Sequence, residues 1–525
     1  MRHLANKLFG NFTLGILIIC LQFFWLVYML YNTKAANSAI NIVFIVVAVL
    51  LSLHIANKEI RTAYKLSWIF LILSLPVFGI PAFFLFGRSE LTRRTRREMG
   101  ALAEEFAGLR VEDAAVREAL KKESPDAAQH SKYITDYAKF PLYREEATEY
   151  FPSGEALFPR FLEDLKSAEQ FIFLEYFIME PGEMLDAIVA ILEEKAKSGV
   201  LVRVIYDDVG CIRTLPPKYF RTFASSGIES VSFNPFRPFL SVIMNNRDHR
   251  KIAVVDGRIA YTGGFNLADE YINATRRFGY WKDAGIRMEG ACVWSFTTMF
   301  LEMWCYITGK GEDCGKYHPH AGRSAEAAPA EEAGEEEMPA GGSKGYIQPY
   351  GDSPMDYEYV GENVYLNLIN RARDYVYIFT PYLIPGSEMT TALVNAAKSG
   401  VDVRIMVPGI PDKKMVYLLT QSYFSVLIRG GVKIYRYTPG FVHSKCFVVD
   451  DVYAVVGTIN LDYRSLCLHF ECGAFLYRAH AVLQVKEDFL AAVEESHSVT
   501  AEEARNRHFF IRQFYGVLKL MAPLL

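Results

Sequence analysis

The chain carries one short pattern twice, and this repetition restricts its architecture more than any other feature. The first copy runs from His249 to Asn266 and the second from His443 to Asn460. Five residue types recur at identical offsets, which are His249, Lys251, Asp256, Gly263 and Asn266 in the first copy and His443, Lys445, Asp450, Gly457 and Asn460 in the second. A chance match to even one such pattern is on the order of one in several thousand. We infer two related units within one chain.

The resemblance between the two units extends upstream of this pattern. Residues 196–208, AKSGVLVRVIYDD, match residues 397–409, AKSGVDVRIMVPG, and residues 171–182 loosely match residues 376–386. Each copy predicts an apolar strand, an amphipathic helix ending at a glycine, and a second apolar strand. Strands that alternate with helices indicate an α/β sheet in each half. The two halves are expected to form a pseudo-dimer within the chain.

Composition narrows the functional classes. Lys and Arg number 56 against 60 Asp and Glu, for a net charge of -4, so no overall basic character points to nucleic acid. The eight cysteines form no C-x-x-C pair, which argues against a zinc site and a disulfide framework and weakly favours a reducing, cytosol-facing location. Hydrophobic residues make up 51% of the chain, which is high enough to suggest membrane segments.

The N-terminal region contains three apolar runs. Residues 12–31 are free of charge and long enough for a membrane span, and residues 39–56 form a second, slightly short run. The third run, residues 66–86, is interrupted by Pro76, Gly79 and Pro81. Membrane segments tolerate such residues only where the freed backbone groups find partners. No cleavage site follows the first run, so we expect an anchor there.

Flanking charges predict the orientation of this region. Basic residues precede the first run and follow the second and third, whereas the loop between the first two holds only Lys34. Because cytoplasmic flanks collect Lys and Arg, the N-terminus and the globular body are both predicted to be cytoplasmic. The third run is then a re-entrant or interfacial segment. An ordinary third span with the body outside is the alternative.

The domain organisation follows from these patterns. We predict a membrane module at 1–97, a connecting helical region at 98–139, α/β domains at 140–317 and 346–525, and a linker at 318–345. The linker consists of Ala, Glu, Pro and Gly with almost no large apolar residues, so it is expected to be disordered. The C-terminal tail has the pattern of an amphipathic helix, which could pack on the body or on the membrane.

The repeated motif has the chemistry of a phosphate site. Apolar segments on both sides of Asp256 predict a hairpin, and residues two apart on a strand face one side, so His249 and Lys251 project together. Lysine binds phosphate oxygens, and histidine is a nucleophile or proton donor near neutral pH. Two such halves offer two imidazoles for the two ends of an in-line displacement.

A structural interpretation competes with this one. A lone histidine near a strand end is usually structural, and an aspartate beside a turn often bonds the backbone. Asp256 and Asp450 are therefore expected to be partly structural, even though they belong to the motif. The paired His-x-Lys arrangement is the feature that a purely structural role does not explain.

At these residues the sequence resembles the phospholipase D superfamily, whose signature is H-x-K-x4-D-x6-G-x-x-N. Both copies match it, although Gly264 and Thr458 stand where the family often has serine. Membrane segments followed by two motifs, together with YDDVG at 206–210 and NLDYRSL at 460–466, are similar to bacterial cardiolipin synthases. The resemblance implies N-terminal membrane helices followed by two pseudo-symmetric α/β/α domains with one active site between them.

The resemblance also implies roles for the site residues. One histidine attacks phosphorus and the other serves as acid and base, so His249 is assigned as the nucleophile and His443 as the proton donor. A downstream carboxylate orients each histidine, and we expect Asp283 to serve His249 and Glu471 to serve His443. The charge of the transition state would be held by two lysines and two asparagines, Lys251, Lys445, Asn266 and Asn460.

The implied reaction needs no metal and no other cofactor. A phosphatidyl group passes from one phosphatidylglycerol to another, giving cardiolipin and glycerol through a phosphohistidine. The expected partners are phosphatidylglycerol, anionic membrane lipids and the bilayer, and nucleic acid is not expected; homo-oligomer formation stays open. A lipid phosphodiesterase of the same superfamily and a non-catalytic membrane scaffold are the alternatives.

Overall fold

The computed structural model describes residues 35–58, 60–87, 93–216, 219–235, 246–318, 345–356, 358–505 and 509–524. The expected first membrane span and nearly all of the expected linker lie outside these residues. The described chain divides into two compact units, one containing the three helices before Gly87 and one containing the described residues from Arg93 to Tyr515. Each unit is considered by itself.

The N-terminal unit is built from helices α2 (Ala35–Ala56), α3 (Thr62–Ser74) and α4 (Pro76–Phe86). The third apolar run is broken as expected, because α3 ends before Leu75 and α4 begins at Pro76, a residue that suits the first position of a helix. Trp68 and Phe83 pack edge to face with ring centroids 5.3 Å apart in the small core of this unit.

The predicted span at 39–56 is helical and falls within α2. Across the described part of the chain, no helix is both long enough and apolar enough to cross a membrane. The membrane spans and the re-entrant segment are therefore not confirmed.

The larger unit begins with the expected helical region. It contains α5 (Arg93–Ala107), α6 (Ala114–Glu123), α7 (Pro125–Tyr133) and a π-helical turn, η1 (Ile134–Ala138). These helices belong to the globular body: the buried ring of His130 in α7 stacks on Phe475 at 4.4 Å.

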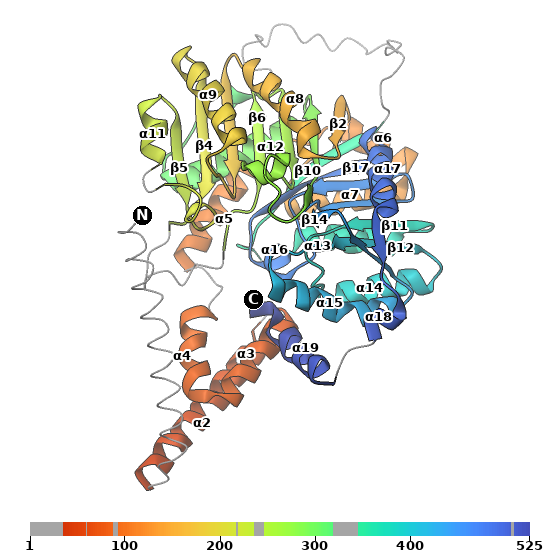
Figure 1. Ribbon diagram of the computed structural model, residues 1–525. Coiled ribbons are helices and arrows are strands. Elements are labelled where there is room, and N and C mark those ends of the chain that lie inside the picture. Colours follow the sequence, from red (N-terminus) through yellow and green to blue (C-terminus); the bar gives the residue numbers. More distant parts are fainter. Residues whose placement is uncertain are drawn as a thin grey trace. The chain divides into compact units, whose positions relative to one another are not determined.

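Two sheets follow, and their strand orders are equivalent (Figure 1). The first sheet has the order β2 (Ala147–Phe151), β9 (Gly285–Glu289), β7 (Ile259–Gly263), β6 (Lys251–Val255), β3 (Phe171–Tyr176), β4 (Leu201–Asp207), β5 (Glu229–Phe233). The second has the order β1 (Tyr143–Arg144), β10 (Tyr346–Asp352), β17 (Glu471–Tyr477), β16 (Tyr453–Gly457), β15 (Cys446–Val449), β11 (Tyr375–Phe379), β12 (Asp402–Pro408), β13 (Lys433–Tyr437), β18 (Ser496–Ser498). Removing the terminal strands β1 and β18 from the second order leaves the same seven positions as in the first, which confirms the internal repeat.

Helices cover both faces of each sheet. The first half carries α8 (Gly154–Lys166), α9 (Glu183–Lys197), α10 (Asp208–Cys211), α11 (Phe220–Ser225), α12 (Val293–Thr308) and the 3₁₀ turns η2 (Asp269–Ile272) and η3 (Cys314–Tyr317). The second half carries α13 (Val360–Arg371), α14 (Ser387–Lys398), α15 (Lys414–Arg429), α16 (Tyr463–Cys467), α17 (Ala481–Glu494) and α18 (Ala501–Arg505). The tail forms α19 (Phe509–Met521) and the closing 3₁₀ turn η4 (Ala522–Leu524), and its residues from Gly516 on belong to the N-terminal unit. The expected α/β/α domains are observed, and the tail is helical.

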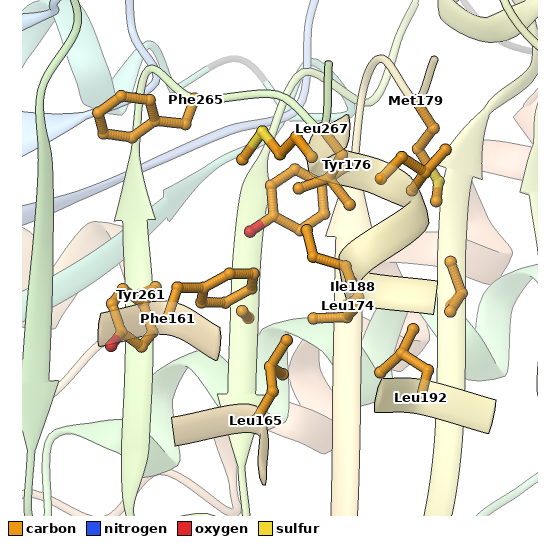
Figure 2. Close-up of a cluster of buried hydrophobic side chains, with 14 of the residues drawn as sticks. Phe161, Leu165, Leu174, Tyr176, Met179, Ile188, Leu192, Tyr261, Phe265 and Leu267 are labelled. Carbon is orange, nitrogen blue, oxygen red and sulfur yellow. The ribbon is translucent and has the colours of Figure 1, made fainter. Parts of the chain in front are cut away.

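The core of the first half shows why its sequence forms these layers. Figure 2 shows Phe161 of α8 and Ile188 of α9 packed over Leu174 of β3. The neighbouring residue on β3, Phe173, points to the other face and stacks on Phe300 of α12 at 4.5 Å. Successive strand residues face opposite sides, so a continuous apolar strand fills two helix–sheet cores at once.

The predicted hairpins are present at both motifs, and their aspartates have a structural role. Asp256 stands directly after β6 at φ 52°, and its carboxylate accepts hydrogen bonds from the backbone N–H groups of Glu169, Gln170 and Phe171 at 2.7–2.8 Å. Asp450 does the same for Arg373, Asp374 and Tyr375.

These contacts agree with the expected structural role of Asp256 and Asp450. Asp256 is separated from Lys251 by the strand β6, and five strand residues span roughly 15 Å. The carboxylate therefore fastens the start of β3 to the hairpin turn, and it lies too far from the motif lysine to share a bound phosphate with it.

We predict that Asp256→Ala destabilises the protein with little effect on chemistry. Three backbone N–H groups lose an ionised acceptor, so the free energy of unfolding should fall by roughly 3 kcal/mol. Thermal denaturation followed by circular dichroism measures the change, and activity per folded molecule should stay within a few-fold. Glu169→Ala, which removes an exposed carboxylate from the same loop, is the control. A fully folded but inactive Asp256→Ala variant would contradict the structural role.

Candidate active site

The site is assembled by main-chain pairing between the two halves. The backbone N–H of His249 donates to the carbonyl of Phe470 at 2.9 Å, and that of Phe470 donates to the carbonyl of Arg247 at 2.8 Å. In the second motif, β14 (Gly440–Val442) pairs in parallel with β8 (Tyr280–Lys282), and the N–H of His443 donates to the Lys282 carbonyl at 2.7 Å. Each motif histidine therefore lies beside a strand of the opposite half.

This pairing decides which carboxylate orients which histidine. Nδ1 of His249 lies 2.9 Å and 3.0 Å from the two carboxylate oxygens of Glu471, and Nδ1 of His443 lies 2.7 Å from Asp283 Oδ2. The sequence-based pairing of Asp283 with His249 and of Glu471 with His443 is wrong. The two carboxylates are the expected ones, but each reaches across to the histidine of the other half.

The two carboxylates have different surroundings. Glu471 accepts hydrogen bonds from the hydroxyl groups of Thr458 and Ser465 as well as from His249. Asp283 accepts the backbone N–H of Ala284 at 2.8 Å, and no hydroxyl group within the described part of the chain donates to it. Gly264, which replaces the family serine in this half, leaves room for Asp283, because a Cβ at that position would meet Oδ1 at 1.9 Å.

These surroundings give the carboxylates opposite pKa shifts. Burial would raise the pKa of Asp283, but His443, Lys445 and the Ala284 N–H more than offset burial and hold this pKa below its usual value. Burial raises the pKa of Glu471 well above the usual glutamate value, and Lys251 and the two hydroxyls compensate only in part. His443 therefore has the more firmly ionised partner.

Both imidazoles favour the neutral form in the unliganded site. Burial, followed by the charge of Lys251, lowers the pKa of His249 well below the ordinary histidine value. Burial and Lys445 lower the pKa of His443 to about 4, against the opposing effect of Asp283. Each side chain still exposes about a tenth of its surface, 10% for His249 and 9% for His443, so a substrate can reach both rings.

The motif lysines are fixed within the same site. Nζ of Lys251 donates to the carbonyl of His249 at 2.5 Å, and Nζ of Lys445 donates to that of His443. Burial lowers the pKa of Lys251 to about 8 and that of Lys445 to about 7. Two buried ammonium groups beside two imidazoles form a site that favours an anion.

The two motif asparagines are not equivalent. Asn266 accepts the N–H of Ile178 at 3.0 Å and donates to the Tyr271 hydroxyl at 2.6 Å, so its amide holds two loops together. The amide oxygen of the buried Asn460 has no hydrogen-bond partner in the described part of the chain. The geometry thus favours Asn460 over Asn266 as a contact for substrate.

The residues that flank the two histidines lie outside the repeated motif, and its pattern does not reveal them. His469 lies beside His249 with ring centroids 5.5 Å apart, and Trp281 lies beside His443 at 5.3 Å. Each stands two residues before an orienting carboxylate. Both positions could have been found by comparing the residues that stand two places before Asp283 and Glu471.

His249, His469 and Glu471 could in principle hold a metal, since their ligand atoms lie within 4.8 Å of one another. The arrangement suits a cation poorly, however. Glu471 and Nδ1 of His249 are already bonded to each other, and Lys251 is one of the charges that act on His249. A positively charged surrounding of this kind opposes a divalent ion and favours a phosphate.

Comparison with known proteins agrees with this geometry. The domain family described as "Cardiolipin synthase, PLD-like domain" matches residues 161–277 and 365–493, and the family "Phospholipase_D-nuclease N-terminal" matches residues 39–88. A cardiolipin synthase of Geobacillus sp. is 34% identical over 91% of this chain and 92% of its own length. The chain belongs to the cardiolipin synthase family of phospholipase D-like proteins. Such relatives place it among the phospholipid transferase enzymes.

Two further proteins are similar to this chain. An uncharacterized protein of Streptococcus mutans is 42% identical over 90% of this chain and 99% of its own length. The crystal structure of phosphatidylserine synthase from Haemophilus influenzae covers 76% of this chain and all of that chain with a TM-score of 0.56. At 15% identity this second likeness shows a shared fold.

We predict that the crossed pairing is visible by NMR. In protein with ¹⁵N-labelled histidine, Glu471→Gln should shift the ring resonances of His249 and leave those of His443, and Asp283→Asn should do the reverse. Assignments come from His249→Ala and His443→Ala. Each carboxylate substitution should also lower turnover by roughly a thousandfold, because the imidazole loses its oriented tautomer. If Glu471→Gln instead shifted the ring resonances of His443, and Asp283→Asn those of His249, the crossed pairing would be wrong.

Proposed function

We propose that the protein transfers a phosphatidyl group from one phosphatidylglycerol to another and produces cardiolipin and glycerol. The observation that supports this most directly is the pair of partly accessible imidazoles, each held at Nδ1 by a buried carboxylate from the opposite half. Their Nε2 atoms are left for chemistry at the two ends of one phosphodiester. Cardiolipin synthase relatives of similar length supply the choice of substrate.

The proposed reaction has two displacements at phosphorus. In the first, Nε2 of His249 forms a bond to phosphorus and the bond to the glycerol oxygen breaks, while His443 gives that oxygen a proton. In the second, His443 takes a proton from a hydroxyl of the second phosphatidylglycerol. The resulting oxygen bonds to phosphorus, and the phosphohistidine bond breaks. One phosphodiester replaces another, so no energy source is needed.

The carboxylate environments support this division of roles. The nucleophile must begin neutral, and the pKa of His249 lies well below the usual value beside a glutamate whose own pKa is raised. The acid must hold a proton, and His443 contacts Asp283, whose lowered pKa keeps it ionised. An ionised partner stabilises an imidazolium, so the proton favours His443 once the anionic substrate enters.

Lys251, Lys445 and Asn460 would hold the non-bridging oxygens of the reacting phosphate. Bringing a phosphate beside two buried ammonium groups raises their pKa values and keeps them charged. Because the site is largely buried, these contacts act at low dielectric and gain strength as charge develops on the oxygens.

The proposal places the enzyme at the cytoplasmic face of a membrane. Helices α2 and α3 expose large apolar side chains, including Ile42, Leu50 and Leu53 at 57–61% exposure and Leu66 at 54%. An apolar surface of this kind suits contact with lipid. The distribution of basic residues around the apolar runs supports the cytoplasmic orientation.

The central experiment incubates purified protein with headgroup-labelled phosphatidylglycerol and identifies the products. Cardiolipin and glycerol are expected in equal amounts. If phosphatidic acid were the main product, the protein would be a lipid hydrolase. If no product formed, the protein would be a non-catalytic scaffold.

We predict that the two histidines fail at different steps. With the 4-nitrophenyl ester of phosphatidic acid, the leaving group needs no proton, so His443→Ala should release about one nitrophenolate per protein and then stop. His249→Ala should release none. Both variants should make no cardiolipin from phosphatidylglycerol. Mass spectrometry should find the phosphatidyl group on the peptide that contains His249. Label on the peptide with His443 would exchange the two roles.

We also predict an alkaline limit set by the lysines. An ammonium group is charged at pH values below its pKa. The pKa is about 8 for Lys251 and about 7 for Lys445. Glu471 and Asp283 are the acidic groups that act on both lysines. kcat/KM for the donor should therefore fall as pH rises through 7 to 8, because the free enzyme loses the charges that bind phosphate. A profile that stays flat to pH 9.5 would show that the lysines remain charged in the free site.

A further inference from the structure

The two halves of the site are related by symmetry, but the residues that flank the two histidines differ. The main-chain pairing has the same register on both sides, so His469 occupies the position of Trp281, and Arg247 that of Phe441. Around His443 the rings of Trp281 and Phe441 lie 5.3 Å and 5.9 Å away. His249 has a histidine and an arginine at the equivalent positions, and the ring of Phe177 from its own half lies 5.1 Å away.

His469 has hydrogen-bonding groups that the protein leaves unused. Neither ring nitrogen has a hydrogen-bond partner within the described part of the chain. Its Nδ1 lies 3.8 Å from Glu471 Oε1, which is too far for a hydrogen bond. The side chain is 11% exposed, and both of its ring nitrogens are buried within the site.

The surroundings of His469 are basic and hold it in the neutral form. Burial, and then the charges of Arg464, Lys251 and Arg247, lower the pKa of His469 well below the ordinary value. Arg247 is itself fixed, because Nη1 donates to Asp207 Oδ1 at 3.3 Å. A neutral imidazole carries one N–H donor, and the positive charges around it favour an anion as the acceptor.

We propose that His469 is a further catalytic residue, which donates a hydrogen bond to a phosphoryl oxygen of the phosphatidyl group while that group is held on His249. This inference rests on the proposed function. It adds no covalent step, since His469 neither gains nor loses a proton.

The asymmetry of the flanks has a chemical reason under this proposal. The phosphatidyl group stays anionic on the nucleophile, and the basic flank lies on that side. The glycerol leaves, and the second lipid enters, opposite the nucleophile in an in-line displacement. The aromatic flank of Trp281 and Phe441 lies there and suits a neutral alcohol from which water is excluded. The differing flanks thus support His249 as the nucleophile independently of the carboxylates.

The test compares His469→Phe, which keeps a ring of similar size without nitrogen, with His469→Asn, which restores an N–H donor. With bis(4-nitrophenyl) phosphate as probe, the rate of the first nitrophenolate release should fall roughly a hundredfold in His469→Phe and recover to within about tenfold in His469→Asn. Binding of tungstate, a phosphate mimic, measured by calorimetry should weaken about tenfold in His469→Phe.

His130→Phe is the matched control, because His130 is fully buried in α7 and both of its ring nitrogens lack partners in the described chain. It should leave both measurements unchanged. If His469→Phe folds poorly, His469→Leu, which also lacks an N–H donor, provides the second variant. Unchanged release and unchanged tungstate affinity in a folded variant would overturn the inference. Because the probe contains no lipid, failure to make cardiolipin would count against the proposed function alone.

Discussion

The hydrogen bonds from His249 to Glu471 and from His443 to Asp283 are the contacts on which the site depends. Both carboxylates have no exposed surface, and a buried carboxylate without a partner costs several kcal/mol. Each finds its imidazole only when the opposite half has folded and docked. The contact that prepares the chemistry therefore also requires the two halves to be joined, which gives a physical reason for carrying the motif twice in one chain.

The site contains two buried ammonium groups that are unfavourable without a negatively charged partner. Lys251 and Lys445 are almost completely buried, and burial lowers the pKa values of both. A phosphate between the two lysines restores the balance of charge. Burying the two ammonium groups costs free energy in the empty site. Part of this cost is recovered only when an anion binds, and this recovery contributes to the affinity for the substrate.

Departures from symmetry distinguish the two halves of the site. Glu471 is fixed by hydroxyls from Thr458 and Ser465, whereas Asp283 contacts a backbone N–H beside Gly264, where no side chain fits. The consequence is a raised pKa on one side and a lowered pKa on the other. A strictly symmetric site would share one proton between equal imidazoles. The different carboxylates remove that equality before substrate arrives.

The sequence by itself determined the repeat, the α/β class, both hairpins, the break before Pro76 and the identity of the two histidines, two lysines and two carboxylates. These features depend on residue type and spacing along one segment, which periodicity and turn chemistry reveal. Tertiary structure decided which carboxylate serves which histidine, that Asp256 and Asp450 hold backbone, and that His469 and Trp281 flank the reacting rings. These relations join segments that are far apart along the chain, from Tyr375 and Asp450 at a separation of 75 to His249 and Glu471 at a separation of 222. The folding of each half and the docking of one half on the other bring such groups together, and spacing along the chain carries no record of it.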